Sequence, residues 1–295
     1  MEVDVKNFCI ISNGLKDKDY EVTKEIKNII EDNGGKTIVI QKGFDNKDKE
    51  SLKVKNVIEN VDFDIEGVIV LGGDGTMLQV ANDMYTYDIP LIGINLGTMG
   101  FLTEIEQNDI RKTIEVIMND EYSIQERIMV KGKIYSEGKE IFSDVALNDI
   151  VIGRYGLSRV MTLEVYVNNE LINIYHGDGI LVSTPTGTTG YNLSAGGPIA
   201  IPDAKLLVIT PICVHSLYSR SVIVSAEDEV RIKVKEERKH QHTEAMATFD
   251  GRAGFKIKED DEIIISKAHK TTSFIKTCDK KFFDIVRDKI EINRN

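Results

Sequence analysis

The chain has 295 residues, which is more than one average domain. Against 37 Lys and Arg stand 48 Asp and Glu, and the resulting formal net charge of −11 argues against a protein that binds nucleic acid or an anionic membrane. Apolar residues make up 41% and charged residues 29%, which is typical of globular and not of disordered proteins.

The three cysteines are widely spaced and fit neither a disulfide framework nor a zinc site. The N-terminus shows no basic segment followed by an apolar run, and no apolar run approaches the roughly 20 residues of a membrane span. We therefore expect a cytoplasmic protein with no membrane and no nucleic-acid partner.

Strand and helix signals alternate over the first 120 residues. Strands are expected at 8–11, 37–40, 67–71 and 91–94, and helices at 17–32, 77–84 and 108–118. The charged segment 45–55 is typical of a mobile loop or a solvated helix face. Alternating strands and helices predict a Rossmann-like parallel α/β domain with helices on both faces of its sheet, which we assign to residues 1–122.

Short strand signals then follow one another over residues 123–277, and the regions outside 185–205 show no long helical pattern. Two of the strands flank Asn168-Asn169-Glu170, which is a hairpin signal. The change from alternating helices and strands to successive strands predicts a second, β-sandwich-like domain. Residues 278–295 contain a helical pattern whose apolar side chains need a neighbour, and we expect this tail to return to the first domain.

The sharpest motif is Gly72-Gly73-Asp74-Gly75-Thr76, directly after a buried strand and before a helix. Glycines let the backbone approach a ligand closely, and a helix N-terminus offers free N–H groups to an anion. The motif is neither a Walker A sequence nor a dinucleotide GxGxxG. Asp74 would repel a phosphate, so contact with a hydroxyl or a metal ion is favoured. A role for Asp74 as the N-cap of the helix is the alternative.

A second Gly-rich segment, Asn95 to Leu102, also follows a strand. In an open parallel sheet, ligands collect at the carboxyl ends of the strands, so we expect this segment and the first loop to lie along one edge. Taken alone, the segment is more typical of a connecting turn with a buried Phe101.

A third segment, residues 177–198, is dense in Thr, Ser and Gly. Its hydroxyl and N–H groups, with Tyr191 as a flat face for a base, suit a nucleoside more than a bare phosphate. An ordered Ω-loop is the alternative. Asn148 and Asp149 interrupt an apolar strand. Their side chains are therefore either hydrogen-bonded at a bend of the strand or functional.

Two histidines, His240 and His242, form an HxH pair. Their charged neighbours are more typical of an exposed loop than of a metal site. We predict no metal-ligating residues.

Together these segments resemble the NAD kinase family, whose members phosphorylate the adenosine ribose 2′-hydroxyl of NAD to give NADP. The resemblance runs from about Val68 to Ile257 and rests on four motifs in the family's order. The matching segments are the GGDG signature at 72–75, an LGxLGFL-like stretch at 96–102, the Asn148-Asp149 pair, and Asp178 with Thr189 to Ser194 on the adenine side.

The resemblance implies that Asp74 is catalytic and accepts the proton of the 2′-hydroxyl. It implies nucleotide contacts from Gly72, Gly73, Gly75, Thr76, Phe101, Asn148, Asp149, Arg159, His176, Asp178, Thr189, Gly190, Tyr191, Asn192, Leu193 and Ser194. It also implies ATP or polyphosphate as donor, Mg²⁺ as the divalent ion, and a homo-oligomer, either a dimer or a tetramer. Both substrates are anionic and the chain is acidic, so binding depends on local donors and not on the overall field.

The sequence departs from the family pattern at five positions. Gly190 stands where Ala is usual, and Val214 and Ser221 replace prolines, all without an expected change of shape. Arg252 and His176 stand where Gln and Arg are frequent, and they bear on fine specificity, including the use of NADH.

Two other functions remain open. Diacylglycerol and sphingosine kinases share a related GGDGT loop, but the Asn148-Asp149 pair, the 189–194 segment and the absence of a basic membrane face argue against a lipid kinase. A non-catalytic NAD-binding sensor is the third possibility, and the intact Asp74 argues against it.

Overall fold

The computed structural model describes residues 6–42, 47–97, 100–155, 160–216, 219–235, 245–252, 254–277 and 281–292. The chain divides into two compact units. The first combines Met1–Glu126 with Thr272–Asn295, and the second is Arg127–Thr271.

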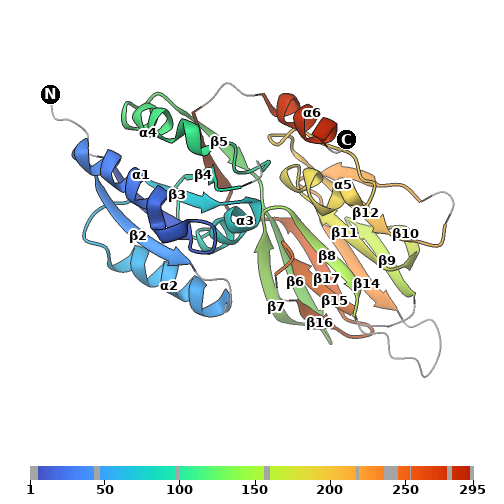
Figure 1. Cartoon of the computed structure of the whole chain (residues 1–295). Helices are drawn as coiled ribbons and strands as arrows, with labels where there is room; N and C mark the ends of the chain where they lie inside the picture. The colour runs from blue at the N-terminus through green and yellow to red at the C-terminus, as the bar shows by residue number, and fades with distance from the viewer. Residues whose placement is uncertain are drawn as a thin grey trace. The chain divides into compact units, whose positions relative to one another are not determined.

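The first unit is built on a six-stranded sheet with the strand order β2-β1-β3-β4-β18-β5 (Figure 1). The strands are β1 (Asn7–Asn13), β2 (Lys36–Lys42), β3 (Gly67–Gly72), β4 (Leu91–Asn95), β5 (Ser123–Arg127) and β18 (Thr272–Lys276). The pairs β1–β2, β1–β3, β3–β4 and β4–β18 are parallel. The predicted parallel α/β domain is confirmed.

Helices cover both faces of this sheet. They are α1 (Glu21–Asp32), α2 (Lys47–Asn60), α3 (Asp74–Asp83) and α4 (Ile110–Met118), with 3-10 turns η1 (Lys18–Tyr20) and η2 (Gln107–Asp109). The unit also contains α6 (Phe282–Ile292). Helix α1 packs against α4 on one face, while α2 lies with α3 on the other (Figure 1). Ile26, Ile30, Ile110 and Ile114 bury the apolar stripes of α1 and α4 against the strands.

The second unit contains two antiparallel six-stranded sheets, with the orders β10-β9-β14-β17-β6-β7 and β13-β12-β11-β8-β15-β16. The strands of the first are β6 (Val130–Ser136), β7 (Lys139–Ala146), β9 (Met161–Val167), β10 (Glu170–Gly177), β14 (Val230–Lys235) and β17 (Glu262–Lys267). Those of the second are β8 (Asp149–Arg154), β11 (Gly179–Ser183), β12 (Leu206–Ile212), β13 (Val222–Ser225), β15 (Ala245–Phe249) and β16 (Phe255–Ile257).

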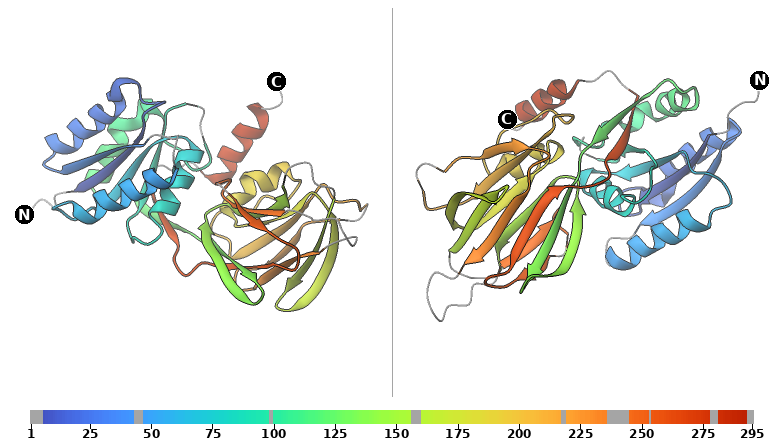
Figure 2. Two further views of the ribbon diagram at one scale, coloured as in Figure 1. Left: turned by 90° about the horizontal axis from the view of Figure 1, so that it is seen from below. Right: turned by 180° about the vertical axis from the view of Figure 1, so that it is seen from behind.

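The two sheets pack face to face around one apolar core (Figure 2). Ile134 and Val165 from one sheet and Ile150 and Ile180 from the other are fully buried in it. Alternating buried residues along β14 and β15 show the inward and outward pattern of a sandwich. The predicted β-sandwich-like fold is confirmed.

The expected β9–β10 hairpin is also present. Its turn residues, Asn168 and Asn169, have φ of 48° and 71°, as a two-residue type I′ turn requires.

The division into units lies a few residues from the boundaries expected at 122/123 and 277/278. The first boundary shifts because β5 (Ser123–Arg127) belongs to the sheet of the first unit, and the second because β18 pairs in parallel with β4 and so joins residues 272–276 to that unit. The tail helix α6 belongs to the same unit. Within the parts of the chain that the structure describes, no helix is long and apolar enough to cross a membrane.

The chain order of the parallel sheet reverses at β1, which lies between β2 and β3. In open α/β sheets the carboxyl ends of the strands at such a reversal form the usual ligand-binding crevice. Here those ends are Asn13 of β1 and Gly72 of β3, so the Gly-rich motif stands at this point.

Candidate active site

Asp74 joins the two Gly-rich loops of the first unit. One oxygen of its carboxylate, Oδ2, accepts the backbone N–H of Phe101 at 2.7 Å, while Oδ1 accepts those of Leu102 at 3.0 Å and Thr103 at 3.2 Å. The Thr103 hydroxyl lies 3.1 Å from Oδ1 and donates to it. The N-cap of α3 is Gly73, with no side-chain capping bond, so the alternative role of Asp74 as N-cap is wrong.

Close packing explains Gly72 of the motif and Gly100 of the second loop. A Cβ on Gly72 would lie 2.5 Å from the Thr76 hydroxyl, and a Cβ on Gly100 would lie 1.7 Å from Asp74 Oδ1. The position of a Cβ on Gly75 is open, with nothing within 4 Å. The first turn of α3 is therefore uncovered at Gly75, and a helix N-terminus with open space beside it is suited to an anion.

Asn13, which the sequence analysis missed, fastens the loop after β1 to this motif. Its side-chain amide donates to Thr76 Oγ1 at 3.2 Å, and its side-chain oxygen accepts the Leu15 N–H at 3.1 Å. The same loop carries Lys16, whose Nζ lies near the backbone of Gly73. The signal that could have found both is their position directly after the first strand, at the carboxyl edge of the sheet.

The second loop is held at both of its ends. Leu96 N–H donates to the Gly72 carbonyl at 3.0 Å, and the Lys289 ammonium of α6 lies 4.5 Å from the centre of the Phe101 ring. Phe101 is half-buried, so the expected buried Phe is only partly confirmed. Residues 98 and 99 lie outside the described residues.

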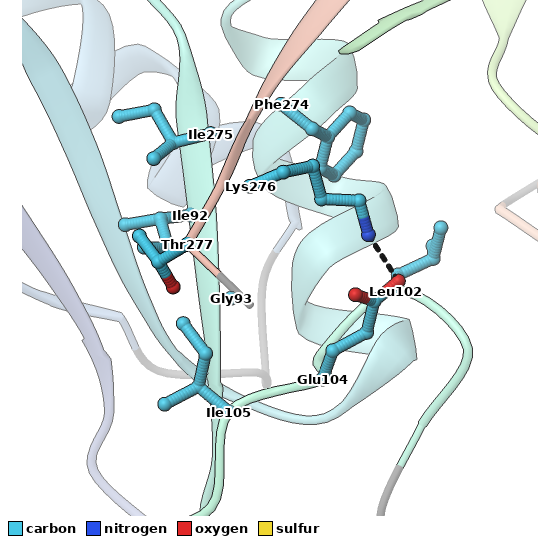
Figure 3. Close-up of a pocket in the computed structure, with 9 residues that line it drawn as sticks. All are labelled: Ile92, Gly93, Leu102, Glu104, Ile105, Phe274, Ile275, Lys276 and Thr277. Atoms are coloured by element: carbon cyan, nitrogen blue, oxygen red, sulfur yellow. Dashed lines mark hydrogen bonds and ion pairs between the residues drawn. The ribbon is translucent and has the colours of Figure 1, made fainter. Parts of the chain in front are cut away.

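A small cavity lies behind this loop, between β4 and β18 (Figure 3). Its volume is about 20 Å³, which holds a water molecule but not a nucleotide. Lys276 pairs with Glu104 at its rim (Figure 3). The cavity is therefore too small to be a substrate site.

In the second unit, Asp250 holds the Asn148-Asp149 pair by its backbone. Its carboxylate accepts the N–H groups of Leu147 at 2.8 Å, Asn148 at 2.7 Å and Asp149 at 3.1 Å. The Asn148 carbonyl accepts the Thr184 N–H at 2.8 Å. Asn148 Oδ1 is buried and has no hydrogen-bond partner among the described residues. A polar atom in this state is costly unless a ligand satisfies it.

Asp149 is the first residue of β8 and is 5% exposed. Burial, and secondarily the Asp250 carboxylate, raise the pKa of Asp149 from 3.8 to about 7. A carboxyl group with a shifted pKa beside an unsatisfied amide is typical of a functional site.

This shift predicts a pH-dependent stability. The folded protein holds the Asp149 proton more tightly than the unfolded chain does. The free energy of unfolding is therefore highest at low pH and falls as the pH rises from about 4 to about 7. Asp149→Asn should therefore raise the free energy of unfolding at pH 8 by on the order of 2–4 kcal/mol and change it little at pH 4. Urea unfolding of both proteins at the two pH values measures the difference, and equal stability at pH 8 would contradict the assignment.

The Thr- and Gly-rich segment forms a 3-10 turn, η3 (Thr186–Thr189), and a short helix, α5 (Tyr191–Ser194). Asn192 is fully buried; its oxygen accepts the Thr210 hydroxyl at 2.7 Å and its amide donates to the Pro198 carbonyl at 2.9 Å. The side chain thus holds the segment in shape, and its expected nucleotide contact stays a prediction.

Tyr191 lies within electrostatic reach of Asp149 and Asp178, two carboxylates expected in the site. Burial first, then the charges of Cys213, Asp149 and Asp178, raise the pKa of Tyr191. The residue is nevertheless 46% exposed. A Cβ on Gly190 would lie 3.1 Å from Asn148 Nδ2, which places the start of α5 against the Asn148 side chain. These residues form one polar cluster around α5, and Thr189, Leu193 and Ser194 flank it.

The remaining residues lie further along the same sheets. Asp178, between β10 and β11, pairs with Arg154 Nε at 3.3 Å, and His176 Nδ1 lies 3.0 Å from the Thr162 hydroxyl on the neighbouring strand. Arg252 binds the Asp144 carboxylate at 2.9 Å and the Val145 carbonyl, so its side chain ties the turn after β15 to β7. Arg159, His240 and His242 lie outside the described residues.

A polar cavity of about 350 Å³ opens beside the end of α5. Residues of β12 and of the segment that follows it line this cavity, including Thr210, Cys213, Arg220 and Ser221. Its volume is within the range of cavities that hold small ligands. Among the described residues, no group of three or more His, Cys, Asp and Glu side chains could hold a metal ion.

A Gly-rich loop at the strand reversal of a parallel α/β sheet is a usual place for phosphate binding, and in this chain a β-sandwich unit with a polar cluster follows it. Two family models match the chain: the ATP-NAD kinase N-terminal domain over residues 8–122 and the ATP-NAD kinase C-terminal domain over residues 147–277. The chain belongs to the NAD kinase family.

Individual relatives agree with this assignment. The chain is 40% identical over 288 residues to an NAD kinase of Lachnoclostridium phytofermentans, covering 97% of this chain and 99% of that protein. It is 41% identical over 287 residues to an NAD kinase of Ruminiclostridium cellulolyticum, covering 97% and 98%.

Solved structures share the fold. A yeast NADH kinase complexed with NADH has a TM-score of 0.84 at 19% identity, covering 99% of this chain and 89% of that one. An NAD kinase from Archaeoglobus fulgidus in complex with ATP has a TM-score of 0.74 at 20% identity, covering 97% and 98%.

Proposed function

We propose that this protein transfers the γ-phosphoryl group of ATP to the adenosine ribose 2′-hydroxyl of NAD, with Asp74 as the proton acceptor. As a member of the NAD kinase family, the chain is a phosphotransferase that phosphorylates NAD with ATP. The observation that supports the site most directly is the Asp74 carboxylate at the strand reversal, beside the open first turn of α3.

The reaction forms a bond between the ribose 2′-oxygen and the γ-phosphorus. It breaks the bond between that phosphorus and the β,γ-bridging oxygen, and ADP leaves. In the proposal, Asp74 takes the hydroxyl proton, while Gly73, Gly75 and the N-terminus of α3 bind phosphate oxygens. A strong base is not required, because phosphoryl transfer passes through a loose transition state and gains mostly from positioning and charge stabilisation.

NAD recognition is assigned to the second unit. The Asn148 side-chain oxygen, which has no hydrogen-bond partner in the described part of the chain, can accept a hydrogen bond from a ribose hydroxyl. Asp149 beside it offers the ribose a second polar group. Tyr191 offers an exposed ring for the adenine, and Asp178 and the Thr189–Ser194 segment frame the same cluster. Phe101, Arg159 and His176 stay predictions from the family resemblance.

Mg²⁺ enters as part of the substrate complex with ATP. Polyphosphate as a further donor, assembly as a dimer or tetramer, and a cytoplasmic location remain proposals from the family resemblance and the sequence.

The deciding experiment offers NAD and MgATP to the purified protein and measures NADP with an NADP-specific dehydrogenase. Parallel reactions replace NAD by NADH or by diacylglycerol vesicles, and ATP by polyphosphate. We expect NADP to accumulate and diacylglycerol to stay unphosphorylated. Labelled diacylglycerol phosphate would establish a lipid kinase, and tight NAD binding without NADP would establish a sensor.

A further inference from the structure

We propose that Lys16 is a phosphate-binding residue of this site and that its ammonium group contacts the triphosphate of the donor nucleotide. The inference rests on the proposed function, because it names the cation that receives the ATP phosphates beside the Gly-rich motif. Lys16 follows the first strand, 56 residues before the motif, and matches none of the family motifs in the sequence.

The geometry places the Lys16 ammonium over two loops. Its Nζ lies 3.1 Å from the position of a Cβ on Gly73 and 3.8 Å from that on Gly97. Gly73 precedes α3 and Gly97 follows β4, so the charge stands above the carboxyl ends of two adjacent strands. A side chain at Gly73 would enter this contact. Glycine at this position lets the ammonium lie close to the backbone at the start of α3.

The loop that carries Lys16 is fixed by hydrogen bonds of its own backbone. The N–H groups of Lys16 and Asp17 donate to the Asn13 carbonyl at 2.9 and 3.0 Å. The Asn13 side chain in turn donates to Thr76 in the first turn of α3. The ammonium is thus presented from a loop that is tied to the motif.

The neighbouring carboxylate does not neutralise this charge. Asp17 is buried and accepts four hydrogen bonds, from the Ser12 hydroxyl, from the N–H groups of Val22 and Thr23, and from the Thr23 hydroxyl. Among the described residues, the Lys16 ammonium has no hydrogen bond or ion pair. An exposed, unpaired ammonium held over a phosphate loop is suited to a ligand with several negative charges.

The charge of Lys16 matters more because the second loop and the segment after it carry no positive side chain. Residues 96–106 contain no Lys or Arg and include two glutamates, and the motif itself contributes the Asp74 carboxylate. In a chain with a net charge of −11, the donor's phosphates need a local cation besides Mg²⁺. Lys16 supplies it in the same unit as the open α3 terminus.

The test compares Lys16→Met, which keeps the length and removes the charge, with Lys16→Arg, which keeps the charge. Lys18→Met is the matched control, because Lys18 is an exposed lysine two residues along in η1. Calorimetry measures binding of the Mg²⁺ complex of β,γ-imido-ATP, of adenosine and of NAD to each protein, and steady-state kinetics give KM for ATP.

We expect Lys16→Met to weaken binding of the ATP analogue about tenfold or more, the usual loss for a charged hydrogen bond. Binding of adenosine and NAD should change less than about twofold. Lys16→Arg should recover most of the analogue affinity, and Lys18→Met should behave as the unaltered protein. Inorganic tripolyphosphate should compete with the analogue in the unaltered protein and compete poorly in Lys16→Met.

An unchanged analogue affinity in Lys16→Met would overturn the inference. An equal loss for adenosine would assign Lys16 to the shape of the loop, and a loss confined to NAD would assign it to the dinucleotide phosphates; either result also overturns it. These binding measurements stand apart from NADP formation by the unaltered protein, which tests the proposed function.

Discussion

Asp74→Asn should lower kcat for NADP formation by about 10² to 10⁴, the usual contribution of a general base, while NAD still binds. The loss is expected because an amide cannot take the proton of the 2′-hydroxyl. Coupled NADP assays give kcat, and calorimetry gives the dissociation constant for NAD.

This substitution also disturbs structure, because the Asp74 carboxylate accepts the N–H groups of residues 101–103. In an asparagine, the side-chain NH₂ group would face one of these backbone N–H groups, and that hydrogen bond would be lost. Thr103→Val is the matched control, since it removes the hydroxyl bond to Asp74 and leaves the carboxylate. A kcat reduced less than about tenfold in Thr103→Val supports proton transfer by Asp74. An equal collapse in both variants would show that Asp74 acts by holding the loop.

Gly187→Ala should weaken NAD binding at least about tenfold and lower the free energy of unfolding by about 1–3 kcal/mol, as overpacking does. A Cβ at this position would lie 2.1 Å from the Asn148 carbonyl oxygen and 2.6 Å from the Ser183 hydroxyl. The backbone of Asn148 or of η3 must therefore move, and either movement shifts the side chains assigned to the ribose.

Gly153→Ala is the control for this variant. Gly153 lies in β8 of the same sheet, and its Cβ would meet the nearest atom, the Asp178 carbonyl oxygen, at an ordinary 3.8 Å. NAD titration and urea unfolding of the two variants measure both effects. Unchanged NAD affinity in Gly187→Ala would contradict the assignment of Asn148 to the dinucleotide.

Much of the first unit could be predicted because its signals are local. The apolar run at 67–71, the glycines and the helix that follows place Asp74 at the end of a buried strand, as the structure has it. The charged segment 45–55 fits either a mobile loop or a solvated helix face; from residue 47 it belongs to α2. Solvated helix faces give weak periodic signals, which explains the ambiguity.

The parts that could not be predicted depend on pairing between distant segments. Asp250 binds the backbone of residues 147–149 about a hundred positions earlier, because β15 pairs with β8. Lys16 reaches Gly73 because β1 and β3 are neighbours in the sheet. Neither contact joins residues at a regular spacing along the chain, so no sequence pattern predicts it. The parallel pairing of β18 with β4 is missed for the same reason, since it follows a long series of antiparallel strands.

The hydrogen bonds of Asp74 and Asp250 have a consequence for engineering. Each carboxylate organises its loop through partners within its own unit, Asp74 in the first and Asp250 in the second. The two hydrogen-bond networks therefore share no residue that the structure describes, and a substitution in one is expected to leave the other intact. If the proposed roles of Lys16 and of residues 147–149 hold, variants at Lys16 should change the use of the phosphoryl donor without altering the backbone hydrogen bonds of residues 147–149.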